Sequence, residues 1–268
     1  MDAAKQVPAG IDLTRPSAAR VYDYFLGGAH NYAVDRELAE QIAARTPNIG
    51  ETMRSNRAFL RRAVRYLVGE GVRQFLDLGS GIPTAGNVHE VAQDAAPDSR
   101  VIYVDIDPVA VEHSRAILEG NERTGVLRAD VREPDRILAD AYALKLLDFG
   151  QPVAVLLAGV LHFVPDADDP ATIVGTLREA VVDGSYLLIS HATADEQPAE
   201  VIEAQRLSAR TATEIHLRSR SEIAAYFDGF TLVEPGLVFI PEWRPDPDQP
   251  ADEHPERVGA YAGVGRKD

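Results

Sequence analysis

Short apolar runs alternate with amphipathic stretches along most of the chain. Strand-like runs at 74–78 and 100–104 each lead through a turn into a stretch whose apolar positions have helical spacing. The run at 153–157 is apolar throughout, which is typical of a central strand in a parallel sheet. Further strands are predicted at 126–128 and 186–190. This repeated order predicts an α/β fold with a mostly parallel sheet.

The last part of the chain departs from this alternation. Helical patterns at 198–227 precede two strands at 230–240 and 258–265, with no helix predicted between the strands. Their connection contains Trp243 and is rich in proline and acidic residues, so we expect an exposed, mobile loop. The tryptophan either contacts substrate or packs locally. Five strand-helix units followed by a hairpin predict a seven-stranded sheet in one domain.

Residues 1–47 have a different pattern and are expected to form an N-terminal extension. Residues 1–16 are polar, whereas 17–32 carry three tyrosines and a phenylalanine beside the pair Gly27–Gly28. A helix is predicted at 18–26, and the glycine pair ends it. This segment is either a lid over a ligand or a helix packed on the sheet, and its aromatic density favours the lid.

Capping signals mark several helix starts. Asp35 is placed to N-cap one helix, and Asn48 with Glu51 three residues later resembles a capping box for another. Asp107 and Asp169 are each followed by proline, which favours the first helical position.

The composition of the chain excludes several classes of function. A length of 268 residues with 45% apolar content suits one large domain. The net charge of −15 argues against a nucleic-acid partner, because phosphate binding needs clustered Lys and Arg. The absence of cysteine excludes thiolate catalysis, thiolate zinc sites and disulfides. With no apolar leader and no run of membrane-spanning length, a cytoplasmic location and no membrane partner are expected; the oligomeric state stays open.

Three successive strands end in aspartate. Asp77, Asp105 and Asp130 are each separated by about one strand-helix unit. Right-handed crossovers between parallel strands place all three carboxylates along one edge of the sheet. Such a row suits a ligand with an amine, a ribose diol and an adenine amino group.

The turn after the first strand restricts the ligand further. Gly79-Ser80-Gly81 leaves room for close approach of a ligand. A dinucleotide motif would need glycine at position 84, where Thr84 stands, and Pro83 removes an N–H donor for a pyrophosphate. A phosphate-binding loop is also absent. A nucleoside ligand with positive charge and no phosphates is therefore favoured, and an NAD-dependent oxidoreductase is disfavoured.

These residues carry a resemblance to a known class of enzymes. The sequence DLGSG at 77–81, followed by Asp105 and Asp130-Val131, resembles the first three motifs of class I S-adenosylmethionine-dependent methyltransferases. More narrowly, four segments resemble an actinobacterial S-adenosyl methyltransferase family formerly catalogued as a domain of unknown function: RVYDYFLGG, FLDLGSGIPT, VIYVDIDP and VLHFVPD. The resemblance implies a Rossmann-like fold with an antiparallel terminal hairpin, residues 48–268 forming the cofactor-binding methyltransferase domain and 1–47 the extension.

The resemblance also implies roles for individual residues. Gly79 and Gly81 would approach the methionine part of S-adenosyl-L-methionine, and Asp77 would support its ammonium group. Asp105 would bind the ribose diol, and Ile106 would cover a face of the adenine. Arg20 or Arg57 is a candidate for the methionine carboxylate. The full set of expected cofactor-binding residues is Asp77, Gly79, Ser80, Gly81, Asp105, Ile106, Asp130, Val131, Ala158, Tyr24 and Arg20.

Candidate catalytic residues follow the fourth strand. His162 lies where class I enzymes place residues facing the methyl acceptor, and a neutral imidazole there could accept a proton. It is equally placed to bond a loop carbonyl or stack near the adenine. His191 is a weaker candidate. Neither forms a metal-binding spacing with His30, so no metal is expected.

Two interpretations of function remain open at this stage. The first is a methyltransferase that acts on a small molecule, with an acceptor that is neither strongly anionic nor polymeric. The second is a regulatory protein that binds S-adenosylmethionine or S-adenosylhomocysteine without turnover. The sequence identifies neither the acceptor nor the accepting atom.

Overall fold

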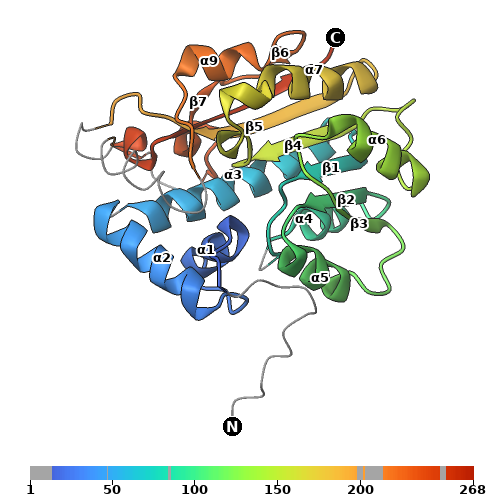
Figure 1. Cartoon of the computed structure of the whole chain (residues 1–268). Helices are drawn as coiled ribbons and strands as arrows, with labels where there is room; N and C mark the ends of the chain where they lie inside the picture. Colours follow the sequence, from blue (N-terminus) through green and yellow to red (C-terminus); the bar gives the residue numbers. More distant parts are fainter. Residues whose placement is uncertain (1–13, 47, 84–85, 198–201, 203–213, 248–251) are drawn as a thin grey trace.

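A computed structural model describes residues 14–46, 48–83, 86–197, 202, 214–247 and 252–268. In these ranges eight strands form one sheet in the order β3-β2-β1-β4-β5-β8-β6, and β7 also pairs with β8 (Figure 1). Strands β1 to β5 are parallel, whereas β8 runs antiparallel to β5. The predicted Rossmann-like α/β fold with an antiparallel carboxyl-terminal part is confirmed.

The elements have the following bounds. The strands are β1 (Gln74–Leu78), β2 (Arg100–Asp105), β3 (Thr124–Arg128), β4 (Ala154–Ala158), β5 (Tyr186–Ala192), β6 (Thr231–Leu232), β7 (Val238–Phe239) and β8 (Ala260–Arg266). The helices are α1 (Ala18–Phe25), α2 (Ala33–Arg45), α3 (Ile49–Gly69), α4 (Val88–Ala95), α5 (Pro108–Ile117), α6 (Pro134–Ala143), α7 (Pro170–Ala180) and α9 (Arg220–Ala225). Short 3₁₀ turns are η1 (Leu161–Phe163), η2 (Asp166–Asp168), η3 (Ile240–Glu242) and η4 (Pro255–Val258).

Helices cover both faces of the sheet. Helices α3, α4 and α5 lie on one side, and α6, α7 and α9 lie on the other (Figure 1). Neighbouring residues of β1 point to opposite faces. Phe75 belongs to the same apolar cluster as Phe59 of α3, whereas Leu76 belongs to the cluster on the other face, with Leu177 of α7. This double coverage explains why β1 and β4 are apolar along nearly their whole length.

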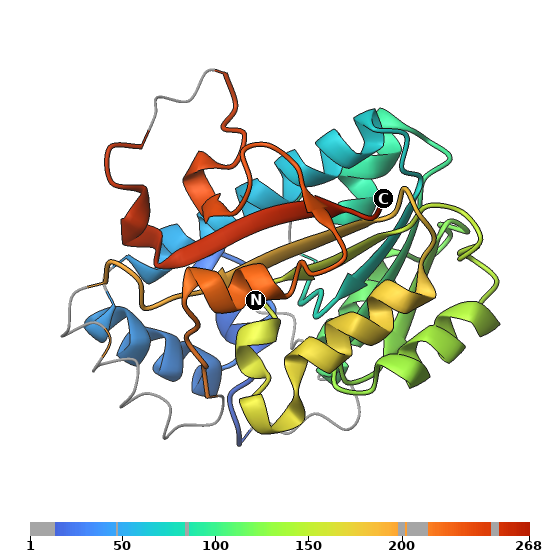
Figure 2. The same cartoon turned by 90° about the horizontal axis from the view of Figure 1, so that it is seen from above.

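The strand order reverses between β1 and β4. The chain proceeds from β1 to β2 and β3 on one side and then returns to β4 on the other side of β1. Open α/β sheets bind ligands at the carboxyl ends of strands at such a point. Helices α1 and α2 lie toward this end of the sheet, where β8 begins (Figure 2), and α1 contacts both α3 and α5.

The sheet has one strand more than the seven predicted. The single strand expected at 230–240 is split into β6 and β7, and both pair with β8. Pro235 has no N–H to donate to a neighbouring strand, and Gly236 has a φ of 89°, outside the extended range. The local backbone therefore turns away from the sheet between the two pieces.

The helix starts agree with the capping signals only in part. Asp107 accepts from the backbone N–H groups of Val109 and Ala110, so its predicted N-cap role is confirmed. Helix α2 begins earlier than expected, so that Asp35 is its third residue and accepts from the N–H of Tyr32. Asn48 does precede α3, but within the described residues its side chain makes no capping hydrogen bond.

The acidic connection before β8 is anchored rather than fully exposed. Trp243 is completely buried and packs edge-on against Phe59 and Tyr66, with ring centroids 5.2 and 5.9 Å apart. The Arg62 guanidinium donates to the carbonyls of Trp243 and Ile240. Local packing, and not substrate contact, is the role of this tryptophan.

Some predictions fall outside the described ranges. These are the polar lead-in through residue 13, Thr84 of the glycine turn, and most of the first helix expected at 198–227. Among the described helices, none combines the length and apolar character that crossing a membrane requires.

Candidate functional site at the carboxyl edge of the sheet

The three strand-end aspartates lie at the same edge of the sheet, as predicted. Asp77 and Asp105 belong to the neighbouring strands β1 and β2 and are 3% and 8% exposed. Asp130 follows β3 and is half-buried. Its carboxylate accepts from the Arg132 guanidinium at 2.6 Å, and this hydrogen bond lowers the pKa of Asp130. Asp130 is therefore the most fully paired of the three acids.

Asp105 joins the glycine turn to the loop after β2. One carboxylate oxygen accepts from the Gly81 N–H at 2.7 Å, and the other accepts from the Asp107 N–H at 2.8 Å. Burial raises the pKa of Asp105 to about 6, against the lowering effect of these backbone donors. Each oxygen keeps a second lone pair, so the carboxylate can accept ligand hydroxyl groups while it holds the turn in place.

The two glycines of the turn serve different purposes. Gly79 and Gly81 have φ values of 68° and 67°. A Cβ on Gly79 would overlap the side chain of Val160, so this glycine allows the loop after β4 to approach closely. A Cβ on Gly81 would meet no described atom within 4 Å. The open space for a ligand therefore lies beside Gly81.

Ile106 is a large apolar residue left exposed beside Asp105. Its exposed fraction is 57%, although it directly follows the buried end of β2. A branched apolar side chain next to a carboxylate and a glycine turn offers a flat surface for a heterocyclic base, which agrees with the adenine-facing role expected for it.

Asp77 is buried without enough compensation to keep its normal acidity. Burial raises its pKa to about 7, Arg57 opposes this rise, and the nearby Asp105 adds to it. A strongly perturbed carboxyl group at a ligand-binding edge is typical of a functional site.

A network missed by the sequence reasoning lies behind Arg57. Ser190 donates to the Asn56 side chain at 2.6 Å, Asn56 donates to the Tyr22 hydroxyl at 3.2 Å, and that hydroxyl donates to the carbonyl of Met53. The Tyr22 ring lies 5.7 Å from the Arg57 guanidinium carbon. The Arg57 Nε is buried and has no hydrogen-bond partner among the described residues. Asn56 gave no signal in the sequence, because an asparagine within a helix is usually unremarkable.

Arg20 is directed elsewhere. Its guanidinium donates to the carbonyl of Arg15, and its Nε lies 3.4 Å from Asp35 and 3.8 Å from Asp107. With 4% exposure, the side chain links α1 to the starts of α2 and α5. The other N-terminal candidate, Tyr24, is half-buried and contacts Phe25 edge-on.

The glycine pair of the N-terminal segment has a structural explanation. The Asp23 carboxylate accepts from the His30 N–H at 2.8 Å and from the Asn31 amide at 2.9 Å. A Cβ on Gly28 would overlap this carboxylate, and Gly27 has a φ of 76°. The chain therefore wraps around Asp23 only because both positions lack a side chain.

His162 lies in η1, just beyond β4. Its ring is half-buried between Phe163 and His191, with ring centroids 4.3 and 5.6 Å away. Burial is the main reason that its pKa lies well below the usual value, and His191 and Arg218 add to the effect. Its Nδ1 has no hydrogen-bond partner in the described part of the chain, so the loop-carbonyl alternative is not observed for this atom. The imidazole is neutral at physiological pH.

His191 has both ring nitrogens engaged. Nδ1 lies 2.7 Å from the carbonyl of Ala192, and Nε2 lies 3.0 Å from the Arg218 guanidinium. Burial lowers its pKa to about 4. His191 therefore acts as a fixed neutral group and not as a free base.

The remaining expected cofactor residues surround the same edge. Ser80 lies between the two glycines, Ala158 ends β4 and pairs with Ser190, and Val131 packs on the core beside Asp130. Within the described residues, no group of three His, Asp or Glu side chains is placed to bind a metal.

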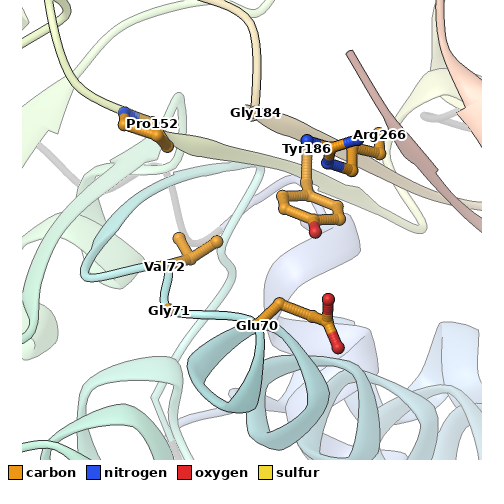
Figure 3. Close-up of a pocket in the computed structure, with 7 residues that line it drawn as sticks. All are labelled: Glu70, Gly71, Val72, Pro152, Gly184, Tyr186 and Arg266. Atoms are coloured by element: carbon orange, nitrogen blue, oxygen red, sulfur yellow. The ribbon is translucent and has the colours of Figure 1, made fainter. Parts of the chain in front are cut away.

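A cavity of about 400 Å³ lies at the opposite edge, before the amino ends of β1, β4 and β5 (Figure 3). Its lining residues are Glu70, Gly71, Val72, Pro152, Gly184, Tyr186 and Arg266. None of the expected site residues lines this cavity. The candidate functional site is therefore at the carboxyl edge, where the acids with perturbed pKa values and the open glycine turn are found.

Comparison with known proteins identifies the family of this chain. The family model described as S-adenosyl methyltransferase matches residues 4–268. The chain is similar to a candidate methyltransferase from Thermobifida fusca YX, with 41% identity over 98% of this chain and 99% of that one and a TM-score of 0.91. A DUF574 family protein from Streptomyces avermitilis MA-4680 is 39% identical over 95% and 98% of the two chains, with a TM-score of 0.90.

More distant likeness supports the fold alone. The N-methyltransferase NodS from Bradyrhizobium japonicum WM9, whose structure contains S-adenosyl-L-homocysteine, is 14% identical over 87% of this chain and 97% of that one, with a TM-score of 0.51. Among curated proteins, none matches the chain.

Proposed function

Because the chain belongs to the S-adenosyl methyltransferase family, it is an S-adenosylmethionine-dependent methyltransferase, and we propose that it transfers the methyl group to a small molecule. The carboxyl edge of the sheet is the proposed site of transfer. The observation that carries this assignment is the Asp105 carboxylate, which is bonded to the Gly81 turn and adjoined by exposed Ile106.

Residues at this edge fit the nucleoside part of the cofactor. The space beside Gly81 would admit the cofactor, the Asp105 carboxylate would accept hydrogen bonds from its ribose hydroxyls, and the exposed Ile106 would cover its adenine. Asp130 and Val131 lie further along the same edge, on the adenine side.

Arg57 is the better candidate for the methionine carboxylate. Both side chains have a buried Nε without a hydrogen-bond partner in the described ranges, but Arg20 lies within 4 Å of the acids Asp35 and Asp107, whereas Arg57 forms no such ion pair with a described residue. Arg57 also lies close enough to Asp77 to lower the pKa of that acid. We therefore assign the carboxylate to Arg57 and the ammonium group to Asp77.

The chain contributes orientation and proton acceptance to the reaction. When bound, the cofactor supplies an electrophilic methyl group on a positively charged sulfur. An acceptor nitrogen or oxygen that arrives protonated must release its proton as the bond to carbon forms. The neutral His162 can take that proton at a ring nitrogen; with its depressed pKa it is a weak base, which suits an acceptor atom that becomes acidic only as methylation proceeds.

A small acceptor is favoured over a polymer. The net charge of −15 opposes binding of nucleic acids. The loop carrying His162 borders the glycine turn through Val160, so the acceptor would enter between neutral and apolar groups.

The test of this function uses cofactor labelled in its methyl group. The protein is incubated with labelled S-adenosylmethionine and cell extract, and the products are separated by mass. We expect label in the low-mass fraction, and no label with Asp105→Ala. Label confined to protein or RNA contradicts a small acceptor. No label in any fraction favours the alternative of a non-catalytic binding protein.

Replacing Arg57 by Gln is expected to weaken S-adenosylhomocysteine binding about tenfold. A hydrogen bond between a guanidinium and a carboxylate contributes about 1.5–3 kcal/mol, and about 1.4 kcal/mol corresponds to a tenfold change. Binding of 5′-methylthioadenosine, which lacks the amino-acid group, should stay unchanged. Calorimetry with both ligands measures the two affinities.

The matched control is Arg54→Gln, which removes an exposed arginine from the same helix. It should leave both affinities unchanged. Equal weakening of both ligands by Arg57→Gln would contradict the assignment, since it would mean that the arginine acts on the nucleoside part.

A further inference from the structure

Arg218 is a buried arginine for which neither the fold nor the proposed chemistry yet accounts. It lies just before α9 and is 5% exposed. Its Nη1 donates to the carbonyl of Leu161 at 3.2 Å, and its Nη2 donates to the carbonyl of Val164 at 2.8 Å and to Asp166 at 2.6 Å. A single guanidinium thus holds the loop after β4 at two backbone carbonyls and one side-chain carboxylate.

The same guanidinium connects this loop to β5. Nη1 lies 3.0 Å from Nε2 of His191, and the cation lies over the Tyr226 ring at 5.8 Å. Because a guanidinium only donates, His191 must accept at Nε2 and carry its proton on Nδ1, which then donates to the carbonyl of Ala192. The Ala192 carbonyl and Arg218 therefore favour the same tautomer of His191, and Arg218 in addition places a positive charge beside Nε2.

The loop held in this way borders the cofactor turn. Val160 precedes η1 and lies against Gly79, where a Cβ would overlap it. His162 is in η1, and its carbonyl accepts from the His216 N–H at 2.7 Å, two residues before Arg218. Movement of the Leu161–Asp166 backbone would shift both Val160 and His162 relative to the glycine turn.

We propose that Arg218 is a positioning residue for methyl transfer: it fixes the loop from Leu161 to Asp166 and ties that loop to Nε2 of His191, and thereby holds His162 beside the acceptor. The proposal rests on the function assigned to the carboxyl edge. It requires that loss of Arg218 impair transfer far more than cofactor binding, since the guanidinium touches neither the glycine turn nor Asp105.

The test combines Arg218→Ala with two independent readouts. Nitrogen NMR of ¹⁵N-histidine-labelled protein reports the tautomer and titration of His191, which is faced by Arg218, His162, His216, Glu222 and Tyr226. Labelled transfer to cell extract reports the rate, and calorimetry reports S-adenosylhomocysteine affinity. We expect the titration of His191 to rise by at least one pH unit, the rate to fall at least tenfold, and the affinity to change less than threefold.

Rescue and control variants separate positioning from general destabilisation. Guanidinium ion added to Arg218→Ala should lower the titration of His191 again and raise the rate at least threefold above that of the variant alone, because it refills the vacated space. Arg220→Ala removes a neighbouring arginine that donates to the carbonyl of Leu237, and should change neither readout nor respond to guanidinium. If Arg218→Ala does not fold, Arg218→Lys replaces it. The His191 titration and the transfer rate of that variant are then compared with those of the unaltered protein.

Several outcomes would overturn the proposal. They are a His191 proton on Nε2 in the unaltered protein, an unchanged His191 titration without Arg218, and an affinity loss as large as the rate loss. Absence of transfer by the unaltered protein would instead contradict the proposed function, and the NMR titration would still decide whether Arg218 acts on His191.

Discussion

Asp105→Ala is expected to reduce the affinity for S-adenosylhomocysteine about 100-fold or more. In the proposed site the carboxylate accepts both ribose hydroxyls, and hydrogen bonds to a charged group contribute about 1.5–3 kcal/mol each. The variant also leaves the N–H groups of Gly81 and Asp107 without their present acceptor, which loosens the glycine turn. Calorimetric titration of the purified variant measures the loss.

Two controls accompany this variant. Asp98→Ala removes an acid whose side chain is 73% exposed and forms a surface ion pair with Arg73, so it should not change the affinity. Asp105→Asn keeps the shape and an acceptor oxygen but loses the charge. Its affinity for S-adenosylhomocysteine should lie between those of Asp98→Ala and Asp105→Ala. An affinity for Asp105→Ala within threefold of the unaltered protein would exclude Asp105 from the ribose site.

The affinity should also depend on pH through the same group. Asp105 accepts ribose hydroxyls best when ionised, and its pKa is raised to about 6 by burial. Affinity is therefore expected to be constant above about pH 7 and to fall as the pH drops through 6 toward 5. Because Asp77 titrates nearby with a pKa of about 7, Asp105→Asn is needed to show which part of the dependence belongs to Asp105.

Asp77→Asn is expected to stabilise the ligand-free protein while weakening cofactor binding. The pKa of Asp77 rises from 3.8 to about 7 on folding, mainly through burial. Each pKa unit corresponds to about 1.4 kcal/mol, so the ionised group costs up to roughly 4 kcal/mol of unfolding free energy at neutral pH. Denaturant unfolding at pH 8 should show a gain of about 1–4 kcal/mol for the variant.

The direction of the pH dependence follows from proton binding. Between about pH 4 and 7 the folded protein keeps a proton on Asp77 that the unfolded chain has released. This group therefore lowers stability as the pH rises through that window, and its contribution is constant above it. In Asp77→Asn this part of the slope should disappear; an unchanged slope would mean that the carboxyl group is solvated in the folded state.

Asp35→Asn is the matched control for burial. Asp35 is fully buried, as Asp77 nearly is, but it accepts from the N–H groups of Ser17 and Tyr32 and lies 3.4 Å from Arg20. Its replacement should lower stability, because these donors would lose a charged acceptor. A gain in unfolding free energy for Asp77→Asn and a loss for Asp35→Asn would distinguish an acid kept for ligand binding from one kept for folding. This contrast is expected where function is maintained at the cost of stability.

Several features of the site could be predicted because they are local. The strand ending in Asp77, the glycines that follow it, and Asp107-Pro108 at a helix start depend on residues adjacent in the chain. The alignment of Asp77 with Asp105 follows from the handedness of crossovers between parallel strands. The glycine turn together with the strand-end acids therefore carries the cofactor interpretation, which the turn alone would not support.

Other features depend on contacts between distant segments. Arg20 and Arg57 are both arginines on helices near aromatic residues, and only packing decides that the first faces Asp35 and Asp107 while the second lies by Tyr22 and near Asp77. Trp243 lies in an acidic stretch that was expected to be exposed, yet it is buried because its ring packs edge-on against Phe59 and Tyr66 of α3. The periodicity of a segment cannot report which distant surface covers it.

The sequence by itself determined the α/β order, the glycine turn, the strand-end acids and the family, since each is written in residues close together or in the regular alternation of strands and helices. The tertiary structure alone decided that Arg20 faces two acids, that Asp77 is buried enough to resist ionisation, and that Arg218 is hydrogen-bonded to the loop of His162. These depend on desolvation and on hydrogen bonds between segments about 50 residues apart or more, which arise only when the chain is packed.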